Sequence, residues 1–384
     1  MRLVRFVVGV WVASRAFFMV TGALGSALVI NAWHANVFRF TPPGTLSYWA
    51  TWDGAWYEDI VRRGYADTTS TAFFPLYPLL VRGGTELGLP PAVSGIVISL
   101  TAFAAALYFF HALAVDYVGP RAAEAATLGL AFFPTAFYFN AVYTESLFLA
   151  LTTGALWALR IRGNVVVAAV LGYFASATRN AGVLILLPLA DELWRRRRQL
   201  AWDDVALVAL VPGGLLAYML FLWQRWRDAL LFSFVERQSW GRSLVDPGET
   251  LASAWRTARD AAPTFADLPG MFAGTQSNPA LIGSNTNNLI FFGLAVVLVA
   301  AAVIRLPLPL ALYAAAIVAL PLLTPVPGFP LMGFPRYVLL AFPLFFVLGE
   351  ALARSRILLA AWLAVSAAYG AYLTVLFVTW RWVA

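Results

Sequence analysis

The chain has 384 residues, of which 61% are hydrophobic and 12% are charged, and its net charge of +7 comes from arginine alone because no lysine is present. Soluble domains carry about 25% charged residues, so this composition indicates an integral membrane protein, and its long continuous apolar runs favour a helical bundle over a β-barrel. The absence of cysteine excludes disulfides and thiol catalysis, and the scatter of arginines into short loops argues against nucleic-acid binding.

The first apolar run, residues 6–30, follows Arg2 and Arg5. It is longer than a signal-peptide core and has no small-residue cleavage site, so we expect a retained first span with a cytoplasmic N-terminus. Residues 31–91 then form a first extracytoplasmic loop. This loop is rich in aromatic residues, proline and glycine, and we expect it to contain short helices lying in the membrane interface.

The rest of the chain predicts a single membrane domain over 1–384, all-α with about eleven spans. Arginine-bearing loops are assigned to the cytoplasm, which fixes the direction of each span. Both ends of the segment 164–194 are assigned to the cytoplasm, and the segment is too long for one span. We therefore expect a hairpin of two short helices that breaks at 178–182. A second extracytoplasmic loop, 225–285, contains a helix-start signal at Asp246-Pro247-Gly248-Glu249. The other expected spans are 93–115, 122–139, 143–161, 203–224, 286–304, 307–323, one beginning near 334, and 357–380.

The stretch 52–65 predicts a helix with one carboxylate that has no local partner. Glu58 and Asp59 each have an arginine four residues later, at Arg62 and Arg63, whereas Asp53 has none. Asp53 lies among aromatic residues in a polar loop between two apolar runs. Such a place suits a catalytic base, and a helix N-cap is the structural alternative for the same residue.

The expected topology brings four charged residues to the outer side: Asp53, Glu145, Arg179 and Arg336. A charged group at membrane depth costs about 2.5–3.5 kcal/mol, so such groups pair or contact a ligand. Two acids and two arginines suit a sugar hydroxyl and an anionic phosphate. The structural alternatives are a helix-dipole role for Glu145 and snorkelling arginines.

Other polar residues are assigned simpler roles. Arg15, halfway through the first span, is expected to be a buried structural partner. His34 and His111 are far apart and lack metal-site spacing, so we predict no metal. A nucleotide-sugar enzyme normally needs a soluble α/β domain and an acidic D-x-D motif, and neither is present. Any sugar donor is therefore expected to be lipid-linked.

Five blocks occur in this order along the chain: Trp52-Asp53 with Gly64-Tyr65, Ala72 to Pro78, Phe137 to Phe148, Arg179-Asn180-Ala181-Gly182, and Arg336-Tyr337 leading to Phe342-Pro343. Together these blocks resemble the PIG-V family of membrane mannosyltransferases, polytopic enzymes of the GT-C class. The block at 179–182 departs from the Arg-Ser-Asn-Gly pattern expected of the family. The use of arginine without lysine resembles that of proteins from high-GC bacteria, so we expect a bacterial member.

The resemblance implies transfer of mannose, or a related hexose, from a polyprenyl-phosphate donor to a hydroxyl of a lipid or glycolipid acceptor. The reaction would take place on the extracytoplasmic face of the cell membrane, among membrane lipids, with Asp53 as general base and with no metal, cofactor or nucleic acid. Arg179 or Arg336 would stabilise the phosphate leaving group, and Glu145 would orient hydroxyls. The expected substrate-binding residues are Trp52, Tyr57, Tyr65, Phe74, Tyr143, Glu145, Arg179, Asn180 and Arg336.

Two other functional classes fit a polytopic chain. A lipid or sugar-lipid transporter should show repeated halves with broken helices and a site near the membrane midplane. A scaffold subunit would use the loops 31–91 and 225–285 to hold a partner enzyme. We favour the enzyme over the transporter because only one broken segment is evident, rather than one in each of two repeated halves. The polar candidates also gather at the expected outer face, not near the midplane.

Overall fold

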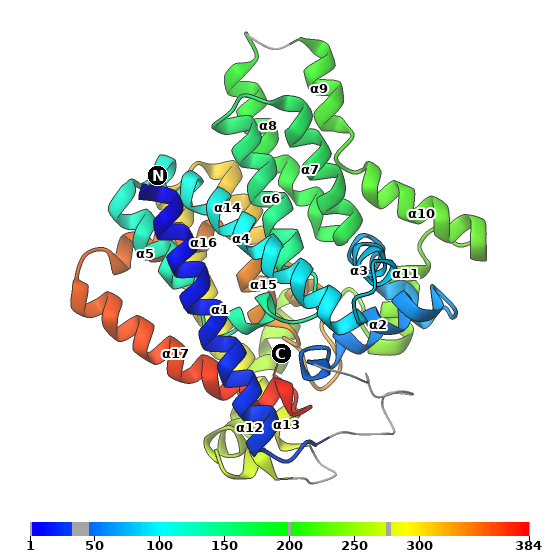
Figure 1. The fold of residues 1–384 in the computed structure, drawn as a ribbon, viewed down its shortest axis with the longest axis vertical. Coiled ribbons are helices and arrows are strands. Elements are labelled where there is room, and N and C mark those ends of the chain that lie inside the picture. Colours follow the sequence, from blue (N-terminus) through cyan, green and yellow to red (C-terminus); the bar gives the residue numbers. More distant parts are fainter. Residues whose placement is uncertain (1, 33–45, 199–200, 274–277, 384) are drawn as a thin grey trace.

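The computed structural model describes residues 2–32, 46–198, 201–273 and 278–383, and in these ranges the chain folds into helices with no β-strand (Figure 1). The predicted all-α class is confirmed. The α-helices are α1 (Arg2–Leu28), α2 (Asp53–Arg63), α3 (Leu76–Glu86), α4 (Pro91–Val118), α5 (Pro120–Ala131), α6 (Glu145–Arg160), α7 (Val165–Thr178), α8 (Leu186–Arg196), α9 (Trp202–Ala209), α10 (Gly213–Trp226), α11 (Leu231–Trp240), α12 (Pro247–Ala266), α13 (Pro279–Arg305), α14 (Leu308–Leu323), α15 (Phe334–Leu340), α16 (Pro343–Leu352) and α17 (Arg356–Val378).

Four helices in the described ranges, α1, α4, α13 and α17, are long and apolar enough to cross a membrane. Two bent pairs, α9–α10 with a 45° bend and α15–α16 with an 84° bend, raise the number to six if each pair is one span. The expected eleven spans are therefore not confirmed. Several expected spans are short helices instead: α5 has 12 residues and α7 has 14, which is about 18–21 Å against a hydrocarbon core of roughly 30 Å.

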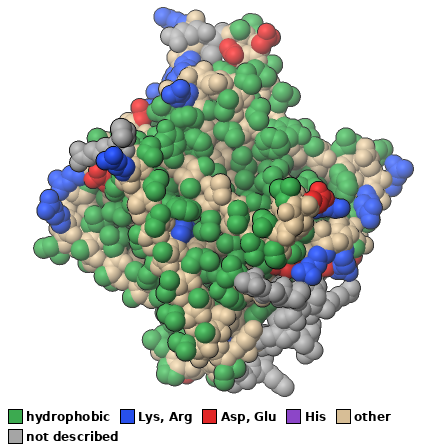
Figure 2. All heavy atoms as spheres, viewed as in Figure 1, with side chains coloured by type: hydrophobic (Ala, Val, Ile, Leu, Met, Phe, Trp, Pro, Cys, Tyr) green, Lys and Arg blue, Asp and Glu red, His purple; other side chains and the backbone are tan. Residues whose placement is uncertain are grey.

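The surface agrees with a membrane setting. Figure 2 shows hydrophobic side chains over the broad middle of one face, while charged side chains gather toward the upper tip and the edges. Exposed apolar residues such as Val12, Leu24, Val297 and Val365 lie on the long helices α1, α13 and α17. An apolar surface of this kind is stable against lipid rather than water.

Helix ends follow the local sequence signals. The Asp246 carboxylate accepts hydrogen bonds from the backbone N–H of Gly248 (2.8 Å) and Glu249 (3.2 Å), so the predicted N-cap of α12 is confirmed. The predicted break in the 164–194 hairpin is also confirmed, because α7 ends at Thr178 and a 3₁₀ helix, η4 (Asn180–Ile185), precedes α8. Short helices fill the described part of the first loop, whereas His34 lies outside the described residues.

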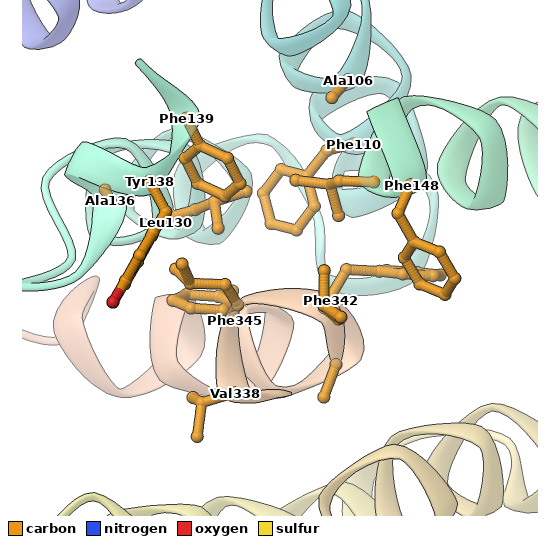
Figure 3. Packing of buried hydrophobic residues seen from close by; sticks show 14 of the residues in the cluster. Ala106, Phe110, Leu130, Ala136, Tyr138, Phe139, Phe148, Val338, Phe342 and Phe345 are labelled. Atoms are coloured by element: carbon orange, nitrogen blue, oxygen red, sulfur yellow. The ribbon is translucent and has the colours of Figure 1, made fainter. Parts of the chain in front are cut away.

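The core of the helical bundle is rich in aromatic side chains. Figure 3 shows Phe110 of α4, Phe139 and Phe345 of α16 turned into one cluster, and Phe139 stacks on Phe103 with ring centroids 4.1 Å apart. Arg15 is 3% exposed in this core. It donates hydrogen bonds to the carbonyl of Ala131, the last residue of α5, and to that of Ala136, within the segment that links α5 to α6. Its predicted structural role is confirmed.

Candidate active site

The start of α2 is held in an unusual backbone conformation. Trp52 has φ 55° and ψ −116°, the geometry of the first central residue of a type II′ turn, where glycine is usual. Its ring packs against Trp382, with ring centroids 4.9 Å apart. The Tyr143 hydroxyl accepts a hydrogen bond from the backbone N–H of Asp53 (3.2 Å) and donates one to the Thr51 carbonyl (3.1 Å). These contacts fix where α2 begins.

Asp53 is the first residue of α2, and its carboxylate makes no capping hydrogen bond. The N-cap alternative is therefore wrong, because the cap position belongs to Trp52. The Oδ2 atom of Asp53 instead accepts a hydrogen bond from Nη1 of Arg336, 283 residues later, at 2.6 Å. The partner that the local sequence does not provide comes from α15.

Glu145 joins the two arginines of the site. Its Oε1 atom lies 2.6 Å from Nη2 of Arg179 and 2.7 Å from Nε of Arg336. The Glu145 side chain is fully buried, whereas those of Arg179 and Arg336 are 17% and 12% exposed. Thr144 accepts a further hydrogen bond from Nε of Arg179 at 2.7 Å. The four charges predicted to share one side therefore form one connected cluster, in the order Asp53, Arg336, Glu145, Arg179.

Neighbouring rings and a close backbone approach position the two arginines. The guanidinium of Arg336 lies over Tyr143, 4.7 Å from the ring centroid, and over Tyr138 at 5.2 Å. Arg179 is held by the fold of η4 back onto α7. There a Cβ atom on Gly182 would lie 2.2 Å from the carbonyl oxygen of Ala175, so only glycine fits.

A polar cleft of about 160 Å³ opens above this cluster. Its walls come from the first loop, the break after α7, α11 with the residues that follow it, α15 and the C-terminal segment. The lining residues are Asp53, Tyr57, Ala72, Phe73, Phe74, Thr178, Arg179, Asn180, Glu236, Trp240, Arg242, Met332, Gly333, Arg336, Tyr337 and Trp382.

The structure sorts the predicted site residues into three groups. Asp53, Tyr57, Phe74, Arg179, Asn180 and Arg336 line the cleft. Trp52, Tyr143 and Glu145 lie behind its wall, where they fix the backbone and the charges described above. Tyr65 lies elsewhere: its hydroxyl donates to the Phe73 carbonyl at 2.7 Å, and its ring lines a neighbouring apolar cavity.

The second loop contributes residues that the sequence did not single out. Glu236 and Trp240 of α11 and Arg242 after it all line the cleft. Burial raises the pKa of Glu236, and the nearby cations Arg242 and Arg179 oppose that rise. The helical signal at Asp246 identifies the following helix, α12, but no motif marks α11 as part of the site.

The arrangement leaves donors and acceptors for a ligand. Within the described residues, the hydrogen bonds of the cluster use Nε and Nη2 of Arg179 and Nε and Nη1 of Arg336. One terminal nitrogen of each guanidinium is therefore left for an anion. Likewise, Oδ2 of Asp53 accepts the hydrogen bond from Arg336, so Oδ1 is left to accept a proton from a hydroxyl.

Comparison with known proteins gives a family for the N-terminal half. A family model described as Mannosyltransferase (PIG-V) matches residues 2–191, which include Asp53, Glu145 and Arg179 but not Arg336. GPI alpha-1,6-mannosyltransferase 2 of Homo sapiens is 29% identical over 195 residues, covering 45% of this chain and 39% of the human protein. The Mus musculus protein of the same name is 29% identical over 181 residues, covering 41% of this chain and 36% of that protein.

A solved structure also resembles the fold. The apo crystal structure of the Archaeoglobus fulgidus oligosaccharyltransferase superposes with a TM-score of 0.45 at 15% sequence identity, covering 96% of this chain and 56% of that chain.

Proposed function

The chain belongs to the mannosyltransferase (PIG-V) family, and on that premise we propose that it is a membrane glycosyltransferase whose active site is the cleft above Asp53. The proposed reaction moves mannose, or a related hexose, from a polyprenyl-phosphate donor to a hydroxyl of a lipid or glycolipid acceptor on the extracytoplasmic face. The curated relatives are named as mannosyltransferases. The observation that carries the proposal is the ion-pair cluster joining Asp53, Arg336, Glu145 and Arg179 beneath a polar cleft.

In the proposed step the acceptor hydroxyl oxygen bonds to the anomeric carbon as the bond from that carbon to the phosphate oxygen breaks. Asp53 takes the hydroxyl proton through Oδ1, and the lipid phosphate leaves with the electron pair. The sugar's anomeric configuration inverts because attack and departure occur on opposite faces. General-base catalysis of this kind contributes about 10²–10⁴-fold in rate.

The arginines act on the leaving group. The unused terminal nitrogens of Arg179 and Arg336 would bind the phosphate oxygens as negative charge grows on them. Glu145 acts as a positioning residue, because its buried Oε1 holds both guanidinium groups in one place. This role replaces direct contact between Glu145 and a substrate hydroxyl, since Glu145 does not line the cleft.

The proposal can be tested by comparing two classes of sugar donor. Purified protein in nanodiscs, supplied with a lipid extract of the source membrane, would receive radiolabelled mannose either as polyprenyl-phosphate mannose or linked to a nucleotide. We expect label in a new glycolipid only from the polyprenyl-phosphate donor. Equal transfer from the nucleotide donor, or no transfer from either, would count against the proposal.

A further inference from the structure

The helix α11 forms one wall of the cleft and presents a carboxyl group to it. Phe232, Glu236 and Trp240 are spaced four residues apart and therefore share one face of this helix. Phe232 packs on Phe74 of the first loop, with ring centroids 5.4 Å apart, while Glu236 and Trp240 line the cleft. The contact of α11 with residues 69–72 of the same loop holds this face toward the site.

The Glu236 carboxyl group is open to a ligand. Within the described residues it makes no hydrogen bond and no ion pair. Asp53, the other acid among the described residues that line the cleft, is paired with Arg336 through Oδ2. Glu145 is fully buried behind the cleft. Both oxygen atoms of Glu236 are therefore left to accept hydrogen bonds from a bound molecule.

The turn after α11 keeps the nearest cation from occupying this carboxyl group. Gly241 has φ 69°, and a Cβ atom there would lie 2.8 Å from Cδ of Pro327. This turn lets the backbone N–H of Arg242 donate to the Glu236 carbonyl at 3.3 Å. Nη1 of Arg242 donates to the Thr324 carbonyl at 3.0 Å. The Arg242 guanidinium is thus held by a backbone carbonyl and not by the Glu236 side chain.

Trp240 supplies an apolar surface next to the carboxyl group. Its ring packs against Phe73 in a T-shaped arrangement with centroids 6.1 Å apart, and Phe73 stacks on Trp56 at 5.8 Å. This row of rings fixes the Trp240 side chain one helical turn from Glu236. A pyranose ring has a face of C–H groups and a rim of hydroxyls, so an aromatic ring beside a carboxyl group is complementary to it.

The charges of the cleft decide which part of the donor reaches Glu236. The donor phosphate is assigned to Arg179 and Arg336, and a carboxylate repels a phosphate. In a polyprenyl-phosphate sugar the hexose is bonded directly to that phosphate, and Glu236 lies near Arg179. The part of the donor beside Glu236 is therefore the neutral hexose, whose hydroxyls donate hydrogen bonds to carboxylate oxygens.

We propose that Glu236 and Trp240 form the subsite for the transferred hexose, here called the hexose subsite. Glu236 accepts hydrogen bonds from two neighbouring hydroxyls, and Trp240 covers the apolar face of the ring. The inference rests on the proposed transferase function and adds the residues that select the sugar. The subsite lies beyond residues 2–191, the part that the family model matches. It should reject a hexuronic acid, which would bring a second negative charge beside Glu236.

Binding of the donor lipid, measured without acceptor, tests the hexose subsite. Tritiated polyprenyl-phosphate mannose and tritiated polyprenyl phosphate without a sugar are each titrated onto the full-length protein in nanodiscs. Glu236→Gln removes the charge of the subsite and keeps the side-chain size, and Trp240→Leu removes the aromatic ring. Matched controls are Glu249→Gln and Trp255→Leu, at exposed positions on α12 in the same loop.

We expect Glu236→Gln to lower the affinity for polyprenyl-phosphate mannose by about 10–100-fold, the effect of losing hydrogen bonds to a charged group. The same variant should bind the lipid without a sugar at least as tightly as wild type, because a negative charge near the phosphate is gone. Trp240→Leu should also weaken only the mannose-bearing lipid, and both controls should bind as wild type does. Unchanged affinity of Glu236→Gln for the mannose-bearing lipid, or an equal loss for both lipids, would overturn the assignment.

A charged sugar tests the selectivity of the subsite. Wild type should bind polyprenyl-phosphate mannuronic acid more weakly than polyprenyl-phosphate mannose, and Glu236→Gln should narrow this difference. Equal binding of the two sugars by wild type would contradict the role of Glu236. No transfer occurs in these assays because acceptor is absent. Failure of the transferase proposal appears as missing transfer when acceptor is supplied, whereas failure of this inference appears in the affinities of Glu236→Gln.

Discussion

Glu145 is the residue on which the charge cluster depends. Replacing it by Gln leaves two mostly buried guanidinium groups without their shared anion, which should lower the free energy of unfolding by roughly 3–5 kcal/mol. Thermal unfolding of Glu145→Gln in detergent measures this loss. The control Asp260→Asn breaks an exposed pair and should leave the unfolding temperature nearly unchanged. Equal unfolding temperatures for wild type and Glu145→Gln would show that the cluster adds no stability.

Glu58 should make folding stability depend on pH. Burial raises its pKa from 4.5 to about 7, an effect that its pair with Arg62 only partly offsets. The folded state then binds a proton that the unfolded state has already lost, so this contribution to stability is present at low pH and is lost between about pH 4.5 and pH 7.

Unfolding temperatures of wild type and Glu58→Gln at about pH 5 and about pH 8 test whether stability falls as the pH rises. The Gln variant should gain stability relative to wild type as the pH rises, because it cannot carry the buried charge. Glu86→Gln, at an exposed pair on α3, should show no such gain. A stability difference between wild type and Glu58→Gln that does not change with pH would contradict the raised pKa.

The sequence predicted much of the site at this scale. Charge position alone brought Asp53, Glu145, Arg179 and Arg336 to one side, and the structure brings them into contact. The sequence could not predict that the Glu145 side chain is buried beneath the two arginines. The burial of a side chain depends on packing between distant helices, and the pairing partner of Asp53 is 283 residues away.

At the scale of elements, the break between α7 and η4 controls where Arg179 points. Gly182→Ala would place a Cβ atom 2.2 Å from the Ala175 carbonyl oxygen, so η4 must move away from α7. Overpacking of this kind costs about 1–3 kcal/mol, and the displaced Arg179 should slow transfer. The control Gly83→Ala adds a Cβ with nothing within 4 Å. Transfer by Gly182→Ala at the wild-type rate would mean that this contact does not position Arg179.

Helix boundaries were predicted well and spans were not. The break at 178–182, the N-cap of α12 and the apolar helices α4, α13 and α17 lie where hydropathy and capping signals indicate. The count of eleven is not confirmed because the segments 122–139, 143–161, 164–194 and 307–323 contain helices of only 11–16 residues, whereas a membrane crossing needs about 20. Hydropathy also does not report bends, which divide two further expected spans. The 84° bend between α15 and α16 occurs at the residues before Pro343, and the 45° bend between α9 and α10 occurs next to Pro212 and Gly213. Contributions of α11 to the cleft depend on tertiary packing against η2 (Thr69–Ala72) and had no sequence signal.

For the whole molecule, orientation in the membrane decides where the cleft faces. The positive-inside rule places α3 outside and the loop after α6 inside. Because the chain has no cysteine, single cysteines can be introduced without removing any. Glu86→Cys should react with a membrane-impermeant maleimide on intact cells, whereas Arg162→Cys should react only after permeabilisation. The reverse pattern would place the cleft on the cytoplasmic side.

The proposed glycosyl transfer requires Asp53 as the proton acceptor. Asp53→Asn keeps the size of the side chain and can still accept a hydrogen bond from Arg336, so the protein should remain folded. The decisive measurement is the rate of mannose transfer from radiolabelled polyprenyl-phosphate mannose to glycolipid by wild type and Asp53→Asn at matched unfolding temperatures. We predict a fall of about 10²–10⁴-fold for Asp53→Asn. Transfer by the variant at a rate close to that of wild type would show that Asp53 is not the proton acceptor.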